Sequence, residues 1–136
     1  MRWRWLACCL AVASSTCGGS STNPVNPPTP TTSTTTTFTP APNQPVVTIT
    51  ANGVSPQQVE IAVGGRVTFV NNNSQTHEMF SDPHPIHTDC PPMNDVGVLS
   101  PGQTKQTGVF PTARTCSYHD HGRPDNTSLQ GWILIR

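Results

Sequence analysis

The stretch Gly64-Gly65-Arg66-Val67-Thr68-Phe69-Val70-Asn71-Asn72 decides the fold class of this chain. Its two glycines mark a turn, and Val67 and Phe69 then alternate with polar or small neighbours before the asparagines end the run. Such alternation is typical of a β-strand with one buried face. We therefore predict a strand over residues 66–70.

Similar patterns lie on both sides of this strand. We predict further strands over residues 46–50, 59–63, 104–110, 115–118 and 131–136, with a short apolar piece at 98–99. Residues 74–97 lack periodicity and contain four prolines, so we expect a long functional loop there. No long amphipathic helix pattern occurs after residue 45. Short strands at this spacing predict an all-β domain, a β-sandwich or barrel, over residues 46–136.

The first residues have the pattern of a secretion signal. Arg2 and Arg4 precede a short apolar run at residues 6–13, which is too short to span a bilayer. We assign residues 1–16 to a signal peptide. The pattern is similar to that of bacterial lipoproteins, in which the first cysteine after cleavage, here Cys17, receives the lipid. Ordinary secretion without a lipid is the alternative, and both place the domain outside the cytoplasm, at the cell envelope, in the periplasm or on the extracellular face.

Residues 17–45 form a segment rich in threonine, proline, serine and asparagine. Such a segment buries too little apolar surface to offset its ordering entropy, so we predict a disordered linker that lifts the domain off a membrane. Without the two signal arginines, five basic side chains face seven acidic ones, a formal charge of −2. This charge argues against a nucleic-acid partner, which needs clustered Lys or Arg.

The last 60 residues contain all five histidines and two cysteines, Cys90 and Cys116. Clustered histidine and cysteine in an exported domain allow two interpretations, a metal site and a disulfide. Imidazole and thiolate ligands together suit copper and zinc.

Four stretches of residues 46–136 resemble the cupredoxins, the blue copper proteins of the plastocyanin and azurin type. The stretches are residues 65–72 followed by His77, residues 99–104, residues 116–119 and residues 131–135. The resemblance implies a Greek-key sandwich and one copper ion held by His77, Cys116 and His119. It also departs from the family, because Leu129 stands where an axial methionine is usual. His121 is therefore a further candidate ligand on the open side of the ion.

A disulfide between Cys90 and Cys116 is the alternative, since an even number of cysteines in an exported domain usually means a bridge. Cys116 would then have no thiolate to offer. Metal could still bind through imidazoles alone, from His77, His119 and His121, with His84 or His87 as further donors. His84 and His87 have the three-residue spacing of a metal pair, but exposed loop histidines are the simpler interpretation. Among the nearby acids, Asp120 is the best candidate for orienting a ring.

Together these patterns predict an exported copper-binding protein that acts in one-electron transfer or copper handling. We expect a monomer with a redox partner protein, and contact with a membrane only through the lipid anchor. An enzyme is less well supported, because no nucleophile motif or phosphate-binding loop is present. The alternative is a disulfide-stapled binding or structural module with a histidine-only metal site or no metal.

Overall fold

The computed structural model describes residues 44–136. The signal peptide, Cys17 and nearly all of the linker predicted from the sequence lie outside these residues. The described part contains nine strands and two short 3-10 helices. The strands are β1 (Val46–Thr50), β2 (Gly53–Ser55), β3 (Gln58–Ile61), β4 (Thr68–Asn71), β5 (His77–Ser81), β6 (Gly97–Leu99), β7 (Thr104–Gln106), β8 (Arg114–Asp120) and β9 (Gly131–Ile135), and the 3-10 helices are Pro91–Asp95 and Thr127–Leu129.

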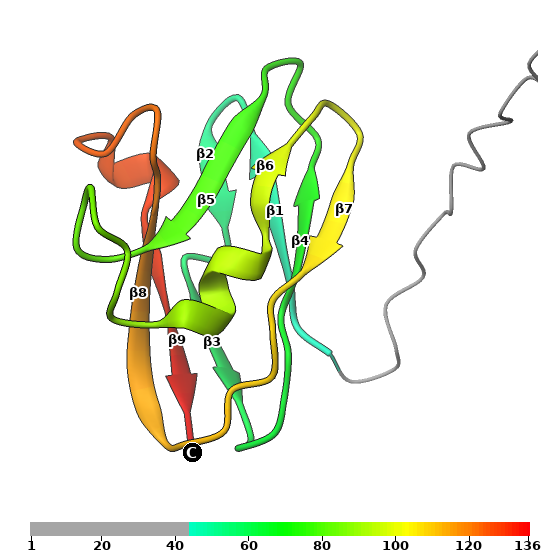
Figure 1. Ribbon diagram of the computed structural model, residues 1–136. Coiled ribbons are helices and arrows are strands. Elements are labelled where there is room, and N and C mark those ends of the chain that lie inside the picture. Colours follow the sequence, from blue (N-terminus) through cyan, green and yellow to red (C-terminus); the bar gives the residue numbers. More distant parts are fainter. Residues whose placement is uncertain (1–43) are drawn as a thin grey trace, which may run out of the picture. The chain divides into compact units, whose positions relative to one another are not determined.

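The strands form two sheets (Figure 1). One sheet has the order β2-β1-β4-β7, and the other has the order β3-β9-β8-β5-β6. Both sheets are mixed, because β1 pairs in parallel with β4 and β3 in parallel with β9, whereas the remaining pairs are antiparallel. The predicted all-β sandwich is confirmed. Among residues 44–136, neither helix has the length and apolar character that crossing a bilayer would require.

The core lies between the two sheets and explains the sequence pattern of the central strands. Phe69 of β4 and Tyr118 of β8 meet edge to face with ring centroids 5.2 Å apart, a favoured arrangement for aromatic pairs. Phe69 is fully buried and Tyr118 is 1% exposed. The alternation in the predicted strand at 66–70 therefore marks the face that packs against the opposite sheet.

The strand β5 was missed by the sequence analysis, which expected a loop over residues 74–97. Its burial alternates, with His77, Met79 and Ser81 buried and the two residues between them partly exposed. Two of the three buried side chains are polar, so the apolar alternation that signals a strand is weak. Asn71 stabilises the preceding turn, because its side-chain amide donates hydrogen bonds to the carbonyl oxygens of Gln75 and Leu99.

Candidate metal site

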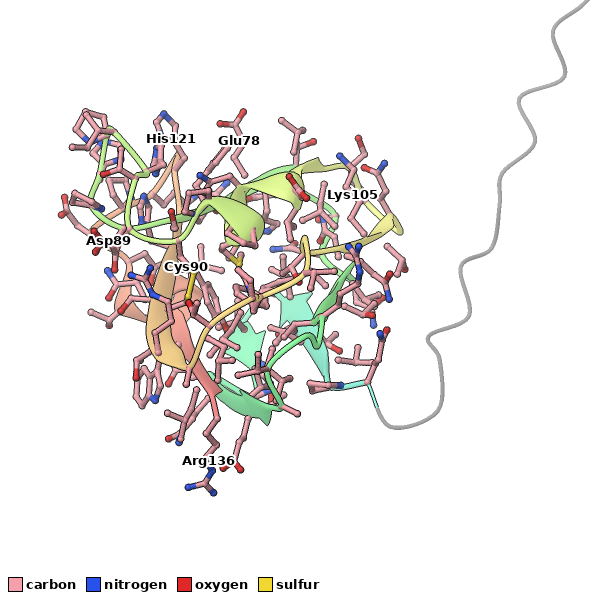
Figure 2. The ribbon with its side chains drawn as sticks, turned by 60° about the horizontal axis from the view of Figure 1, so that its bottom comes forward. Glu78, Asp89, Cys90, Lys105, His121 and Arg136 are labelled. Atoms are coloured by element: carbon pink, nitrogen blue, oxygen red, sulfur yellow. A yellow bond between two sulfur atoms is a disulfide. The ribbon has the colours of Figure 1, made fainter. Side chains whose placement is uncertain are left out.

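Four histidine rings gather on the outer face of the five-stranded sheet. His119 lies in β8 and His121 follows that strand, whereas His84 and His87 lie in the loop over residues 82–90. One nitrogen atom from each ring lies within 4.8 Å of those of the other three. Figure 2 labels His121 at the upper left of the molecule. We call His84, His87, His119 and His121 the four-histidine cluster.

The two-residue period of a strand explains how β8 supplies two of these rings. Cys116 and Tyr118 point into the core, each 1% exposed. Successive side chains of a strand point to opposite faces, so His119 points outward, and His121, two residues later, lies on that side as well. Phe80 stands opposite His119 in the β5–β8 ladder, and its ring packs against those of His87 and His121, with centroids 4.8 and 5.8 Å away.

The loop over residues 82–90 is held in place by hydrogen bonds on both sides of His87. The His87 amide donates to the Pro83 carbonyl oxygen at 2.8 Å. The His87 carbonyl oxygen accepts from Asn94 Nδ2 at 2.8 Å and from Ser81 Oγ at 3.1 Å. His87 also has a φ of 52°, in the left-handed region that non-glycine residues seldom adopt. These hydrogen bonds fix the conformation of the loop, so that its two imidazoles face β8.

Hydrogen bonds to the Nδ1 atoms orient two of the rings. His119 Nδ1 lies 2.7 Å from Asp82 Oδ1, and His87 Nδ1 lies 2.7 Å from the Ser81 carbonyl oxygen. A carbonyl oxygen only accepts, so His87 Nδ1 carries the proton and Nε2 is the nitrogen that faces the cluster. That Nε2 lies 2.8 Å from His121 Nδ1. Metal-binding histidines are usually oriented in this way by a carboxylate or a carbonyl group.

One buried nitrogen of the cluster is left without a hydrogen bond in the part of the chain that the structure describes. His119 is 2% exposed, and within the described residues its buried Nε2 has no partner. Leaving a buried polar atom unpaired is costly, which suggests that a bound group completes the site. A metal–imidazole bond is about 2.0–2.1 Å long, so two nitrogens on opposite sides of one ion are about 4 Å apart. The cluster therefore needs only small side-chain shifts to surround an ion.

The surroundings of His84 favour its neutral form. The pKa of His84 is lowered from the ordinary 6.5, first because the ring loses water and then because the neighbouring imidazoles of His121, His119 and His87 oppose a further positive charge. Asp125 acts in the opposite direction. A neutral imidazole is the form that binds metal, so this environment maintains the ligand-competent state.

The thiolate predicted at Cys116 is not available in this structure. Cys90 and Cys116 form a disulfide, with Cα atoms 5.7 Å apart, and Figure 2 shows the yellow bond beside the Cys90 label. The alternative pairing from the sequence analysis is therefore the one that the structure contains. The resemblance also implied that Cys116 and His119 face the same ion. They instead lie three residues apart in a strand, where an odd spacing directs side chains to opposite faces.

His77 does not join His119 and His121 either. It is buried in β5 with its ring directed inward, and its Nδ1 lies 2.7 Å from Asp120 Oδ2. Arg123 Nη1 lies 3.2 Å from the same carboxylate oxygen and 3.3 Å from His77 Nδ1. In the cupredoxin pattern, this ring lies beside a cysteine and beside the histidine three residues after that cysteine. In this protein, the ring lies beside Asp120 and beside Arg123, which is three residues after Asp120. The positive charge of a guanidinium group beside the ring repels a metal cation. His77 therefore belongs to a cluster with Asp120 and Arg123 and not to a metal site.

Comparison with known proteins supports the fold. No protein-family model and no curated protein sequence matches the chain. Among solved structures, the novel purple cupredoxin from Nitrosopumilus maritimus is 20% identical, with a TM-score of 0.52 over 68% of this chain and 100% of the other. A reduced variant of amicyanin is 18% identical, with a TM-score of 0.53 over 71% and 85%. The Cu(I) form of another amicyanin variant is 19% identical, with a TM-score of 0.52 over the same shares. The described domain therefore has the cupredoxin fold.

The sequence analysis named two members of the cluster, His119 and His121, as ligands. It favoured exposed loop residues for His84 and His87 and kept them as further donors in the disulfide alternative. Only His84 is exposed, and His87 is partly buried. The His-x-His spacing at 119 and 121 was the available signal, because in a strand it places two imidazoles on one face. Asp120, the acid named from the sequence, orients the ring of His77. Within the four-histidine cluster, the carboxylate that orients a ring is that of Asp82, which contacts His119.

Proposed function

We propose that this is an exported copper-binding protein of cupredoxin fold, which holds the ion through the four-histidine cluster. The unpartnered Nε2 of buried His119 is the observation that carries the proposal. The hydrogen bonds that Asp82 and the Ser81 carbonyl group accept support it, because they engage the Nδ1 atoms of His119 and His87 and leave the Nε2 atoms on the side of the cluster. All four donors are imidazole nitrogens, which suit copper, zinc and nickel.

Copper is the metal that the chemistry and the fold favour. Divalent copper binds nitrogen sites more tightly than the other divalent first-row metals. Amicyanin, which has the same fold, was solved in a Cu(I) form. The bound ion would supply a redox-active centre, and the protein would supply four imidazoles and the Asp82 carboxylate.

Copper handling, meaning capture and delivery of the ion at the cell envelope, is the role that fits this donor set best. The set has no thiolate, because Cys116 is in a disulfide, so a strongly covalent copper–sulfur bond is not available for electron transfer. His84 is exposed, which leaves one ligand open to exchange with an acceptor. One-electron transfer to a redox partner protein is the second candidate, favoured by the fold shared with amicyanin.

We also infer the location from the sequence and the disulfide. Disulfides persist in oxidising compartments, in agreement with the signal at residues 1–16. Lipidation at Cys17 would tether a monomeric domain to a membrane through the linker, with no nucleic-acid partner and no other membrane contact. Metabolic labelling with a fatty acid, lost in a Cys17→Ala variant, tests the anchor.

The test of the metal site is a competition titration with a chromophoric copper chelator, with electron paramagnetic resonance to identify the ligands. The double variant H119A/H121A is expected to bind copper about 100-fold more weakly or worse. Removing a group that only orients a ligand costs up to about 100-fold, and removing two ligands should cost at least as much. The control is H77Q, which removes the one histidine outside the cluster and is expected to bind copper normally.

The spectra should show nitrogen ligands and no strong band near 600 nm, the absorption of a copper–thiolate bond. Copper binding that survives the double substitution but is lost in H77Q would refute the proposed site. Tighter binding of zinc than of divalent copper, measured in the same titration, would refute the choice of metal.

A further inference from the structure

The disulfide joins the two chain segments that carry the four-histidine cluster. His87 stands three residues before Cys90, and His119 stands three residues after Cys116. The bond therefore joins the chain segment that carries one ligand pair to the strand that carries the other. Both sulfur-bearing residues are 1% exposed and part of the core, so the connection is made on the inner face of the sheet, beneath the site.

Cys90 also ends the hydrogen-bonded network of the loop. Its amide donates to Ser81 Oγ at 3.4 Å, and the same hydroxyl donates to the His87 carbonyl oxygen. The other direct links between the loop and the end of β8 are noncovalent. The Asp82 amide donates to the Ser117 carbonyl oxygen at 3.3 Å, and His119 Nδ1 hydrogen-bonds to Asp82. The rings of His84 and His87 lie against those of His119 and His121. The covalent bond is thus the strongest restraint that holds the loop histidines against those of the strand.

We propose that formation of the Cys90–Cys116 disulfide is the step that assembles the copper site, so that the protein takes up metal only after oxidation. The inference rests on the proposed function. In the thiol form, only noncovalent contacts and the β5–β8 ladder hold the loop against β8, and the effective concentration of one ligand pair near the other falls. The thiol form keeps the His119–His121 pair, which offers two donors instead of four.

The chemistry of this step is a thiol–disulfide exchange. The two cysteine thiols transfer two electrons and two protons to the disulfide of a dithiol oxidant, which leaves as a dithiol, and the bond between Cys90 and Cys116 forms. Because the finished bond is buried, small thiols have little access to it. The oxidation therefore acts once, during maturation. While the chain is in a reducing compartment, the bond has not formed and the site stays unassembled.

The experiment compares three forms of the chain: the oxidised protein, the protein reduced in denaturant and refolded without oxygen, and the double variant C90A/C116V, in which alanine and valine occupy the buried space of the disulfide. Copper affinity is measured by chelator competition, and folding by circular dichroism. A second readout needs no metal: the ring N–H resonances of His87 and His119 in nitrogen-15 spectra report whether the cluster is assembled.

We expect both forms without the disulfide to bind copper at least about tenfold more weakly, from the lost effective concentration, and to lack the protected ring resonances. A failure of both forms to fold would give the same conclusion, because the site would then not exist without the bond. Equal affinities in all three forms would overturn the inference while leaving the proposed function intact. Weak binding by the oxidised protein itself would instead refute the proposed function.

Discussion

Replacing Asp82 by asparagine should weaken copper binding, because the Asp82 carboxylate orients a ligand without touching the ion. Its Oδ1 lies 2.7 Å from His119 Nδ1, which fixes the ring and makes its other nitrogen a better donor. Loss of such a partner typically costs 10- to 100-fold in metal affinity. The Asp82 side chain is 41% exposed, so water screens part of its charge, and we expect the lower end, about tenfold or about 1.4 kcal/mol.

The matched control is Asp89→Asn, which removes the same charge from the same loop. Asp89 is exposed, and its backbone amide donates a hydrogen bond to the Asp82 carbonyl oxygen. Both variants are titrated against a chromophoric copper chelator at constant pH and ionic strength. The D82N protein should lose affinity and the D89N protein should not. Equal losses would show that only net charge matters, and the orientation argument would fail.

Three further predictions concern the ligands, a packing position and acid stability. His84→Ala should reduce copper affinity less than His119→Ala, because His84 is exposed and His119 is buried and oriented; chelator competition measures both. Gly131→Ala should destabilise the domain by about 1–3 kcal/mol in urea unfolding, because the added carbon would overlap the Gln57 carbonyl oxygen, whereas Gly122→Ala, with its nearest neighbour at 3.6 Å, should be close to neutral. The pKa of His84 should lie below 6.5 in an NMR titration of the metal-free protein; since the unfolded chain then binds more protons, the free energy of unfolding should fall as the pH drops through 6.5.

The sequence predicted the strands whose buried face is apolar. Residues 46–50 coincide with β1, and the strand predicted at 131–136 matches β9 except for its last residue. These segments are rich in branched apolar side chains that pack between the sheets. The strand β5 could not be recognised in this way, because His77 and Ser81 are polar and buried at once. Their burial depends on partners far along the chain, such as Asp120 for His77.

The candidate site was predicted in part, for a related reason. His119 was named from the resemblance to the cupredoxins, and His121 was named as a further ligand on the open side of the ion. His84 and His87 join them through a loop whose course is set by hydrogen bonds to Ser81 and Asn94 and by the link to Cys90. Contacts of that kind depend on tertiary structure and leave no periodic signal in the sequence. The same holds for the choice of Asp82 over Asp120 as the acid beside the cluster.

The two faces of β8 have a consequence for how this protein can change. Inward residues such as Tyr118 fill the interior, whereas outward residues such as His119 carry the reactive groups. On this strand the side chains that carry the chemistry are therefore different from those that fill the interior, and the buried Cys116 is the one core position that also bears on the site. A protein engineer could exchange the imidazoles for other donors and graft a different inorganic centre onto an unaltered scaffold.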